Sequence, residues 1–304
     1  MSRGHRLQMK ILLFGVLGRR SLGYAIRERL LARGHFVTPL AGSPQDIKSL
    51  TKQDLASADA VIDAQLPDPS ESRKTGLPLR PMQLQTMLKG SGKTLIMTSS
   101  VVVLGDTGPI PVDEGMSPHA PRKFAWLAEL EGEIQSTSDL RGVVIRPAME
   151  HYRSLSVAMG NCITLALRFK EGKYIGDGMN CWSAVHPDDL ADLYCLALDK
   201  AEKGMLVHAS SETFSMKQLA SVIHFGLGLK GEPSSMSLEE AKRFSPIAEN
   251  LTRNSAISSD LAKRTLGWRP SRDSILKLVE NQAYVSRHEI GRVPAPCFKP
   301  TAGS

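Results

Sequence analysis

The chain has 304 residues, of which 41% are hydrophobic and 23% charged, a composition typical of a globular protein with a core and room for a second lobe. Its net charge is +7, but the basic residues are dispersed and only 5% of residues are aromatic, which argues against a nucleic-acid surface. No apolar run approaches the length of a membrane span. We therefore expect a small-molecule substrate as partner, with a homodimer left open.

The first half of the chain alternates short apolar runs with amphipathic runs. The apolar runs predict strands at 10–16, 35–42, 58–65, 93–105 and 141–147. The amphipathic runs predict helices at 22–34 and 122–135. This alternation indicates an α/β fold with an open parallel sheet covered by helices on both faces, whose ligands bind beyond the carboxyl ends of the strands.

The second half predicts helices at 187–200, 215–228, 237–244 and 258–268, with few strands. Segment 66–81 is rich in proline and is expected to form a long surface loop. The four cysteines form no C-x-x-C pair, and no histidine cluster has metal-ligand spacing, so we expect a reduced, cytoplasmic protein without a metal site.

A glycine-containing turn, "GVLGRRSLG", joins the first predicted strand to the first helix. Gly15 and Gly18 have the spacing of a turn that cradles phosphate. Backbone N–H groups there can face a pyrophosphate, and the helix N-terminus adds partial positive charge. The position of this turn, between a strand and a helix, predicts a dinucleotide site.

Four further stretches occur in a fixed order: 97–114, 143–148, 176–198 and 258–271. With the glycine turn they resemble the extended short-chain dehydrogenase/reductases, the NAD-dependent epimerase/dehydratase family, over roughly residues 9–285. The resemblance implies a Rossmann-type doubly wound sheet in residues 1–150 and a smaller substrate lobe in 151–285 that returns in part to the sheet. Residues 286–304 are expected to form a disordered tail. The resemblance also implies an NAD(P)-linked reaction on nucleotide sugars or small carbonyl compounds.

The expected cofactor contacts depart from the family pattern. The family spacing places a third glycine at Ser21, whereas the next glycine here is Gly23. The second strand ends without the carboxylate that binds the ribose of NAD or the arginine that binds the 2′-phosphate of NADP. Arg19 and Arg20 would supply positive charge, so NADP(H) is expected over NAD(H), in a catalytic or a non-catalytic role. The resemblance also assigns Asp46 and Ala64 to this site.

The expected catalytic set departs further. The family joins a Ser or Thr after the fourth strand to a Tyr-x-x-x-Lys that transfers a proton. Ser100 matches the Ser, but Arg122 and Trp126 take the positions of the Tyr and Lys, and no Tyr-x-x-x-Lys occurs in the chain. Arg122 stays protonated, so it can clamp an anion or polarise a carbonyl but cannot act as a base.

The turn after 141–147 offers replacements for the missing proton relay. Glu150 and His151 bring a carboxyl group and an imidazole to the expected pocket, where either could transfer protons. Tyr152 and Trp182 would line the substrate pocket. Each assignment has a structural alternative: Ser100 as a strand-end cap, Arg122 as a solvated arginine, 150–152 as a polar loop and Trp182 as a core residue.

Three hypotheses about function follow. The first is an NAD(P)-binding, epimerase/dehydratase-like enzyme acting on a small organic or nucleotide-sugar-like substrate with a non-standard acid/base set. The second is a non-redox isomerase, cyclase or lyase on the same scaffold, with the nucleotide structural or absent. The third is a non-enzymatic nucleotide sensor or binding protein. The retained Ser100 and the polar turn favour an enzyme.

Overall fold

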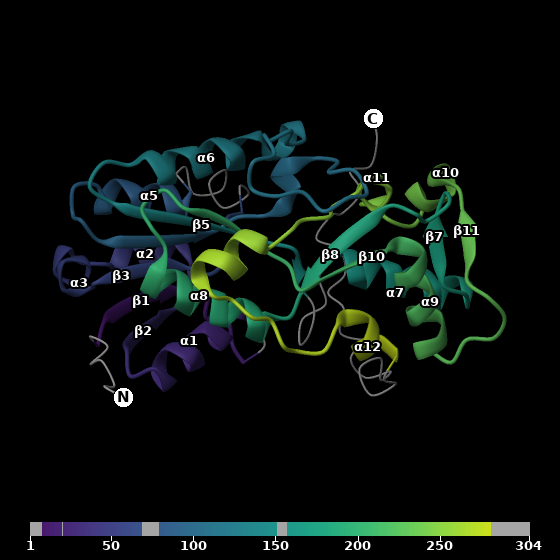
Figure 1. Ribbon diagram of the computed structural model, residues 1–304, viewed down its shortest axis with the longest axis horizontal. Helices are drawn as coiled ribbons and strands as arrows, with labels where there is room; N and C mark the ends of the chain where they lie inside the picture. The colour runs from purple at the N-terminus through teal and green to yellow at the C-terminus, as the bar shows by residue number, and fades with distance from the viewer. Residues whose placement is uncertain (1–7, 20, 69–78, 151–156, 281–304) are drawn as a thin grey trace.

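A six-stranded parallel sheet forms the centre of the protein. The structure is a computed structural model that describes residues 8–19, 21–68, 79–150 and 157–280. The strands are β1 (Lys10–Phe14), β2 (Phe36–Leu40), β3 (Ala60–Asp63), β4 (Thr94–Thr98), β5 (Arg141–Pro147) and β9 (Leu206–Ala209). Their order is β2-β1-β3-β4-β5-β9, and every neighbouring pair is parallel (Figure 1). The predicted α/β fold class is therefore confirmed.

Helices cover both faces of this sheet because its strands are apolar on both sides. Helices α1 (Leu22–Ala32) and α8 (Pro187–Lys200) lie on one face, and α5 (Arg80–Leu88) and α6 (Ala125–Ser136) lie on the other (Figure 1). Leu13 of β1 belongs to the core that contains Ile26 of α1, whereas its neighbour Phe14 belongs to the core that contains Leu84 of α5. Successive residues of a strand point to opposite faces, so each continuous apolar run serves two cores.

Two elements predicted in the first half of the chain differ from the structure. The strand predicted at 93–105 ends at Thr98, where Ser100 caps a 3₁₀ turn, η1 (Val101–Leu104). Val103 and Leu104 are fully buried, so the apolar run continues into the core after the strand has ended. The predicted helix at 122–135 begins with a 3₁₀ turn, η2 (Arg122–Phe124), before α6. Hydrophobicity reports burial, and it does not by itself distinguish these backbone shapes.

Between β2 and β3 the described chain forms two short helices, α2 (Pro44–Ser49) and α3 (Lys52–Ser57), each opened by a capping box. The predicted helix at 258–268 is observed as a π-helical turn, η3 (Ala262–Leu266), which Gly267 ends in the left-handed conformation. The predicted tail at 286–304 and most of the predicted loop at 66–81 lie outside the described residues. None of the described helices is both long enough and apolar enough to cross a membrane.

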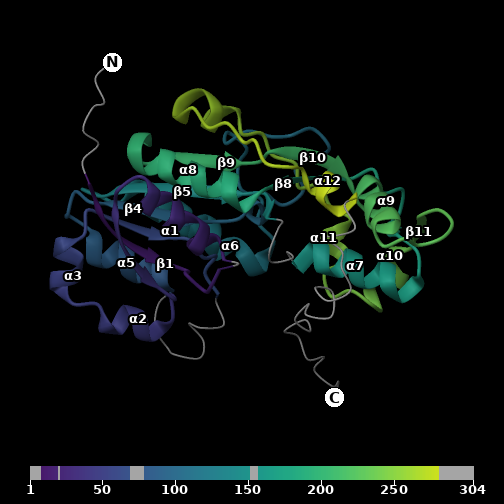
Figure 2. The ribbon, with the colours of Figure 1, turned by 90° about the horizontal axis from the view of Figure 1, so that it is seen from below.

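A second lobe lies beside the sheet (Figure 2). Its helices are α7 (Val157–Phe169), α9 (Met216–Gly226), α10 (Leu238–Lys242), α11 (Ala248–Leu251) and α12 (Ile275–Glu280). One small sheet contains β6 (Met149–Glu150), β8 (Cys181–Val185) and β10 (Glu212–Ser215), and another pairs β7 (Lys173–Ile175) with β11 (Ser234–Met236). The lobe has its own apolar core, which includes Met159, Phe214 and Ile223.

Candidate functional site

The turn between β1 and α1 adopts a glycine-dependent conformation. Gly15 has φ +89° and Gly18 has φ +105°, both in a region that residues with a Cβ rarely adopt. Ser21 caps α1: its Oγ accepts hydrogen bonds from the N–H groups of Leu17 (3.1 Å) and Tyr24 (3.2 Å) and donates to the carbonyl of Gly18 (2.9 Å). The residue at the expected third glycine is thus a helix cap.

Gly23 takes over the packing role of a third glycine. It is the second residue of α1, and a Cβ atom there would overlap the Gly15 carbonyl oxygen and lie 2.6 Å from its carbonyl carbon. Only glycine therefore lets α1 approach the end of β1 this closely. No atom lies within 4 Å of the position that a Cβ on Gly18 would take, so the outer side of the turn is open.

Arg80 links the ends of β2 and β3 beside this turn. Its Nε and Nη2 each lie 2.9 Å from a carboxylate oxygen of Asp63, and its Nη1 donates to the carbonyl of Gly42. Both side chains are buried, and burial raises the pKa of Asp63 in spite of the attraction of Arg80. Because all three nitrogens have partners, the guanidinium at the end of β2 stabilises the fold and is not available to a phosphate.

The predicted cofactor residues lie at different places around the turn. Asp46 Oδ2 accepts hydrogen bonds from the N–H groups of Gly42 and Ser43, both at 2.8 Å, so its carboxylate is engaged in capping α2. Ala64 follows β3, and its carbonyl carbon would lie 3.2 Å from a Cβ on Gly15. Arg19 lines a cavity of about 200 Å³ between α1 and α8, away from β2. Arg20 lies outside the described residues.

One residue at this edge was not anticipated from the sequence. Gln65 lies between the two glycines that end β1 and β2: its Cβ would be 3.1 Å from a Cβ on Gly15, and its Oε1 3.0 Å from one on Gly42. Oε1 is buried, and among the described residues no donor reaches it. A buried acceptor without a donor is a group that a ligand hydroxyl could satisfy. The glycine turn and this acceptor fit the pyrophosphate and ribose of a dinucleotide.

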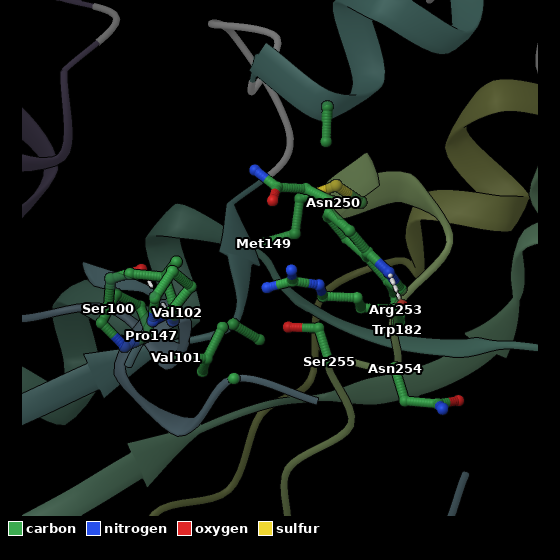
Figure 3. A pocket seen from close by; sticks show the side chains of 14 residues that line it. Ser100, Val101, Val102, Pro147, Met149, Trp182, Asn250, Arg253, Asn254 and Ser255 are labelled. Atoms are coloured by element: carbon green, nitrogen blue, oxygen red, sulfur yellow. Dashed lines mark hydrogen bonds between the residues drawn. The ribbon is translucent and has the colours of Figure 1, made fainter. Parts of the chain in front are cut away.

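A pocket of about 210 Å³ lies where β4 and β5 end and the second lobe begins (Figure 3). Ser100, Val101, Val102 and Pro147 form one wall, and Trp182 and Arg253 form the other. Ser100 Oγ accepts a hydrogen bond from the N–H of Val102 at 3.3 Å, which leaves its proton able to donate. Both predictions for Ser100, a cap and a pocket residue, therefore describe its position.

The predicted Arg122 lies in η2 and is exposed, and it is not among the residues that line this pocket, although its neighbour Pro121 is. Trp126 packs partly against the core, and its Nε1 donates to the carbonyl of Lys123 at 2.9 Å. Neither position supplies a group that can exchange a proton with a substrate in the pocket.

Glu150 is the last residue of β6, and it does not line the pocket with Ser100. Its neighbour Met149 does, and adjacent strand residues point in opposite directions. Burial raises the pKa of Glu150 to about 7, and its charge contributes to raising the pKa of the buried Tyr194 on α8. The carboxyl group can therefore exchange protons near neutrality. His151 and Tyr152 lie outside the described residues.

The raised pKa of Glu150 predicts a pH-dependent stability. Between its ordinary value of 4.5 and about 7, the folded protein binds more protons at this group than the unfolded chain, so the free energy of unfolding falls as pH rises. Glu150→Gln should match the wild type at about pH 4 and exceed its stability at about pH 8. Urea denaturation at each pH measures this.

The matched control is Glu133→Gln on the exposed face of α6. Burial lowers the pKa of His208 to about 4, which gives a slope of the opposite sign, but His208 is present in both proteins and cancels in the comparison. Parallel pH profiles for the wild type and Glu150→Gln would show that this carboxyl titrates normally.

A buried ion-pair network between β5 and α6 lies next to the pocket wall that contains Ser100. Arg146 of β5 donates from Nε and Nη2 to the two carboxylate oxygens of Glu131 on α6, at 2.9 and 2.5 Å. Ser99 also donates to this carboxylate, and Arg146 Nη1 lies 3.4 Å from His208 Nε2. Ser99 and Arg146 immediately precede the pocket residues Ser100 and Pro147, so the network fixes the two strand ends that form the wall.

The second lobe contributes a cation that sequence reasoning missed. Trp182 was predicted to line the pocket, and it does, with its Nε1 donating to the carbonyl of Arg253 at 2.8 Å. The side chain of Arg253 extends into the pocket towards the wall that contains Ser100 (Figure 3). Arg253 belongs to no motif or periodic run, so no pattern pointed to it. Within the described ranges no group of acidic, histidine and cysteine side chains could hold a metal ion.

Comparisons with known proteins agree with this architecture. No protein-family model matches the chain. An uncharacterized protein of Schizosaccharomyces pombe is 28% identical over 302 residues, which cover 91% of this chain and 100% of that protein. The dTDP-glucose 4,6-dehydratase of Bacillus anthracis, solved with NAD, superimposes with a TM-score of 0.71 at 15% identity, covering 92% of this chain and 97% of that one.

The human epimerase family protein SDR39U1, solved with NADPH, superimposes with a TM-score of 0.65 at 18% identity, covering 91% of this chain and 100% of that one. At these identities the structural likeness establishes the fold. The chain therefore has the Rossmann-type fold of the extended short-chain epimerases and dehydratases that bind NAD or NADPH.

Proposed function

We propose that this chain is an atypical NAD(P)-binding enzyme of the epimerase/dehydratase type that acts on a small organic substrate in the pocket beside Ser100. The observation that carries the proposal is the contact between Gly23 and Gly15, which forms a glycine-dependent turn at the N-terminus of α1. In this proposal the pyrophosphate lies on that turn, and Gln65 Oε1 accepts a hydrogen bond from a ribose hydroxyl.

The residues at the strand ends have distinct roles in this proposal. When bound, a nicotinamide ring supplies or accepts a hydride. The Ser100 hydroxyl donates a hydrogen bond to a substrate oxygen, which stabilises negative charge on that oxygen during the reaction. Glu150, with a pKa of about 7, lies on the side of β6 away from the pocket wall, so it has no direct contact with the substrate in this proposal. The substrate lies between Ser100 and the second lobe.

A titration with NADPH and NADH tests the proposal. Gly18→Ala adds a methyl group on the open side of the turn, at φ +105°, and should weaken dinucleotide binding about tenfold or more. Gly90→Ala is the matched control, because Gly90 also has a positive φ, +76°, and open space, but lies at the opposite edge of the sheet before β4. Calorimetry measures both.

The two substitutions should lower thermal stability to a similar extent, because each forces a Cβ into the left-handed region, while only Gly18→Ala should lose affinity. The prediction that NADP(H) is preferred rests on Arg19 and Arg20, and tighter binding of NADH would reject it. If neither dinucleotide binds the wild-type protein at millimolar concentration, the proposal fails.

The second candidate is a non-redox isomerase or lyase, and the polar groups of the pocket favour it. Ser100 and Arg253 line the pocket without any contribution from a dinucleotide, and both can donate hydrogen bonds to a substrate oxygen. The same titration distinguishes the two candidates, because the non-redox isomerase or lyase requires no dinucleotide.

A further inference from the structure

We infer that the pocket beside Ser100 takes a small organic carboxylate with an apolar body, bound through its carboxylate by the guanidinium of Arg253. This inference rests on the proposed function, because it names the substrate class of the same site. Figure 3 shows Arg253 reaching from the second lobe into the space between Trp182 and the wall that contains Ser100.

The first argument is the state of the Arg253 side chain. It is partly buried, and among the described residues no carboxylate or carbonyl oxygen lies within hydrogen-bonding or ion-pairing distance of its guanidinium. An arginine cannot lose its charge at any ordinary pH, so this guanidinium remains a cation at the pocket with water as its partner until a ligand binds. An anionic ligand would satisfy this cation.

The second argument is that the cation is held in place before any ligand arrives. The carbonyl of Arg253 accepts hydrogen bonds from Trp182 Nε1 at 2.8 Å and Asn180 Nδ2 at 2.9 Å, and its N–H donates to the carbonyl of Asn250 at 3.2 Å. These bonds fix the backbone from which the side chain extends. A guanidinium that extends from a fixed backbone reaches a limited part of the pocket, and its planar fork matches the two oxygens of a carboxylate.

The charge of Arg253 lowers the pKa of Asp106, but the Asp106 carboxylate does not form an ion pair with the Arg253 guanidinium. Its Oδ1 accepts hydrogen bonds from the N–H of Gly108 at 2.9 Å and from Asn254 Nδ2 at 3.0 Å. Burial opposes the effect, yet these bonds and the charge of Arg253 hold the pKa of Asp106 below its ordinary value. Asp106 is engaged by the backbone and by Asn254, so the guanidinium is left for a ligand.

The third argument is the size and lining of the pocket. Its volume of about 210 Å³ falls below the roughly 300–1,000 Å³ of pockets that hold drug-sized ligands, so the enclosed part suits a small ligand. Apart from Arg253, much of the surface comes from Val101, Val102, Met149 and Trp182. Asn250, Asn254 and Ser255 also line it beside Arg253. One cation with a few neutral polar groups among apolar side chains fits a monoanion with a short hydrocarbon body that extends towards Ser100.

The experiment uses the full chain and a panel of aliphatic and aryl-substituted monocarboxylates, each paired with its primary amide. Hexanoate with hexanamide and 3-phenylpropanoate with 3-phenylpropanamide represent the two types. Ligand-observed NMR competition and calorimetry measure affinity, with and without NADPH. At least one carboxylate should bind about tenfold more tightly than its amide, because the carboxylate forms an ion pair with the guanidinium whereas the amide offers only a neutral acceptor.

Arg253→Met should abolish this preference by weakening carboxylate binding more than amide binding, while Arg253→Lys, which keeps the charge without the planar fork, should retain part of it. Arg243→Met, at an exposed arginine of the same lobe, is the matched control and should retain all of it. Thermal melting checks that each variant is folded.

The inference is overturned if no carboxylate binds more tightly than its amide, if Arg253→Met keeps the preference, or if phenyl phosphate binds more tightly than any carboxylate. Carboxylate selectivity without NADPH binding would reject the proposed function and keep this inference. NADPH binding without carboxylate selectivity would reject this inference and keep the proposed function.

Discussion

Replacing Arg146 by methionine should destabilise the protein by about 3–5 kcal/mol, the largest effect of any substitution that we consider. Arg146 is 3% exposed and Glu131 is 2% exposed, and the two share two hydrogen bonds. Removing the guanidinium leaves a buried carboxylate with only the Ser99 hydroxyl as a described partner. The free-energy penalty comes from the unpaired charge more than from the lost attraction. Urea denaturation measures it.

A double variant distinguishes this explanation from simple loss of packing. Arg146→Met combined with Glu131→Leu removes both charges, so it should destabilise less than Arg146→Met alone. Lys277→Met is the control, because Lys277 pairs with Asp273 at the surface and should leave the urea midpoint unchanged. A double variant that is less stable than the single one would mean that shape, not charge, governs this cluster.

Replacing Gly23 by alanine should destabilise the protein by about 1–3 kcal/mol and abolish dinucleotide binding. The added Cβ would overlap the Gly15 carbonyl oxygen and lie 2.9 Å from the Val16 nitrogen, so α1 must move away from the end of β1. Both neighbours are backbone atoms, which cannot rotate away as a flexible side chain can. The shift displaces the N–H groups that would face a pyrophosphate.

Gly132→Ala is the control for this substitution. Gly132 also lies within a helix, α6, but no atom lies within 4 Å of its Cβ position, so alanine there should stabilise the helix by about 0.5–1 kcal/mol. Thermal melting and NADPH calorimetry are measured on both variants. If Gly23→Ala melts at the wild-type temperature and still binds NADPH, then the contact between α1 and β1 is not what shapes the turn.

Both predictions concern the edge of the sheet where its strands end, one beside β1 and the other beside β4 and β5. Gly23 determines how closely α1 approaches the end of β1, where the dinucleotide is proposed to lie. Arg146 and Glu131 fix the ends of β4 and β5, where Ser100 and Pro147 form the pocket wall. Loss of stability at either point should therefore also disturb the site.

The sequence by itself determined the sheet and the position of its ligand edge. Continuous apolar runs such as 141–147 predict strands buried on both faces, and β5 occupies those residues. The helix predicted at 187–200 coincides with α8, which begins at a proline and is capped by His186. Gly15 and Gly18 were found from their spacing between a strand and a helix, and Ser100 from the resemblance to the family pattern. These features are local, so a pattern within one segment is enough to specify them.

The tertiary structure alone decided which side chains share the site. Arg253 enters the pocket from a segment more than a hundred residues beyond Ser100, and Glu150 lies on the side of β6 opposite to Met149. The role of Gly23 depends on its contact with Gly15, and Asp46 is engaged in capping α2. A residue type and its spacing record local geometry. The positions of Arg253 and Glu150 at the pocket depend on how distant segments pack, and the contact of Gly23 with Gly15 depends on how closely α1 packs on β1, which residue spacing alone does not encode.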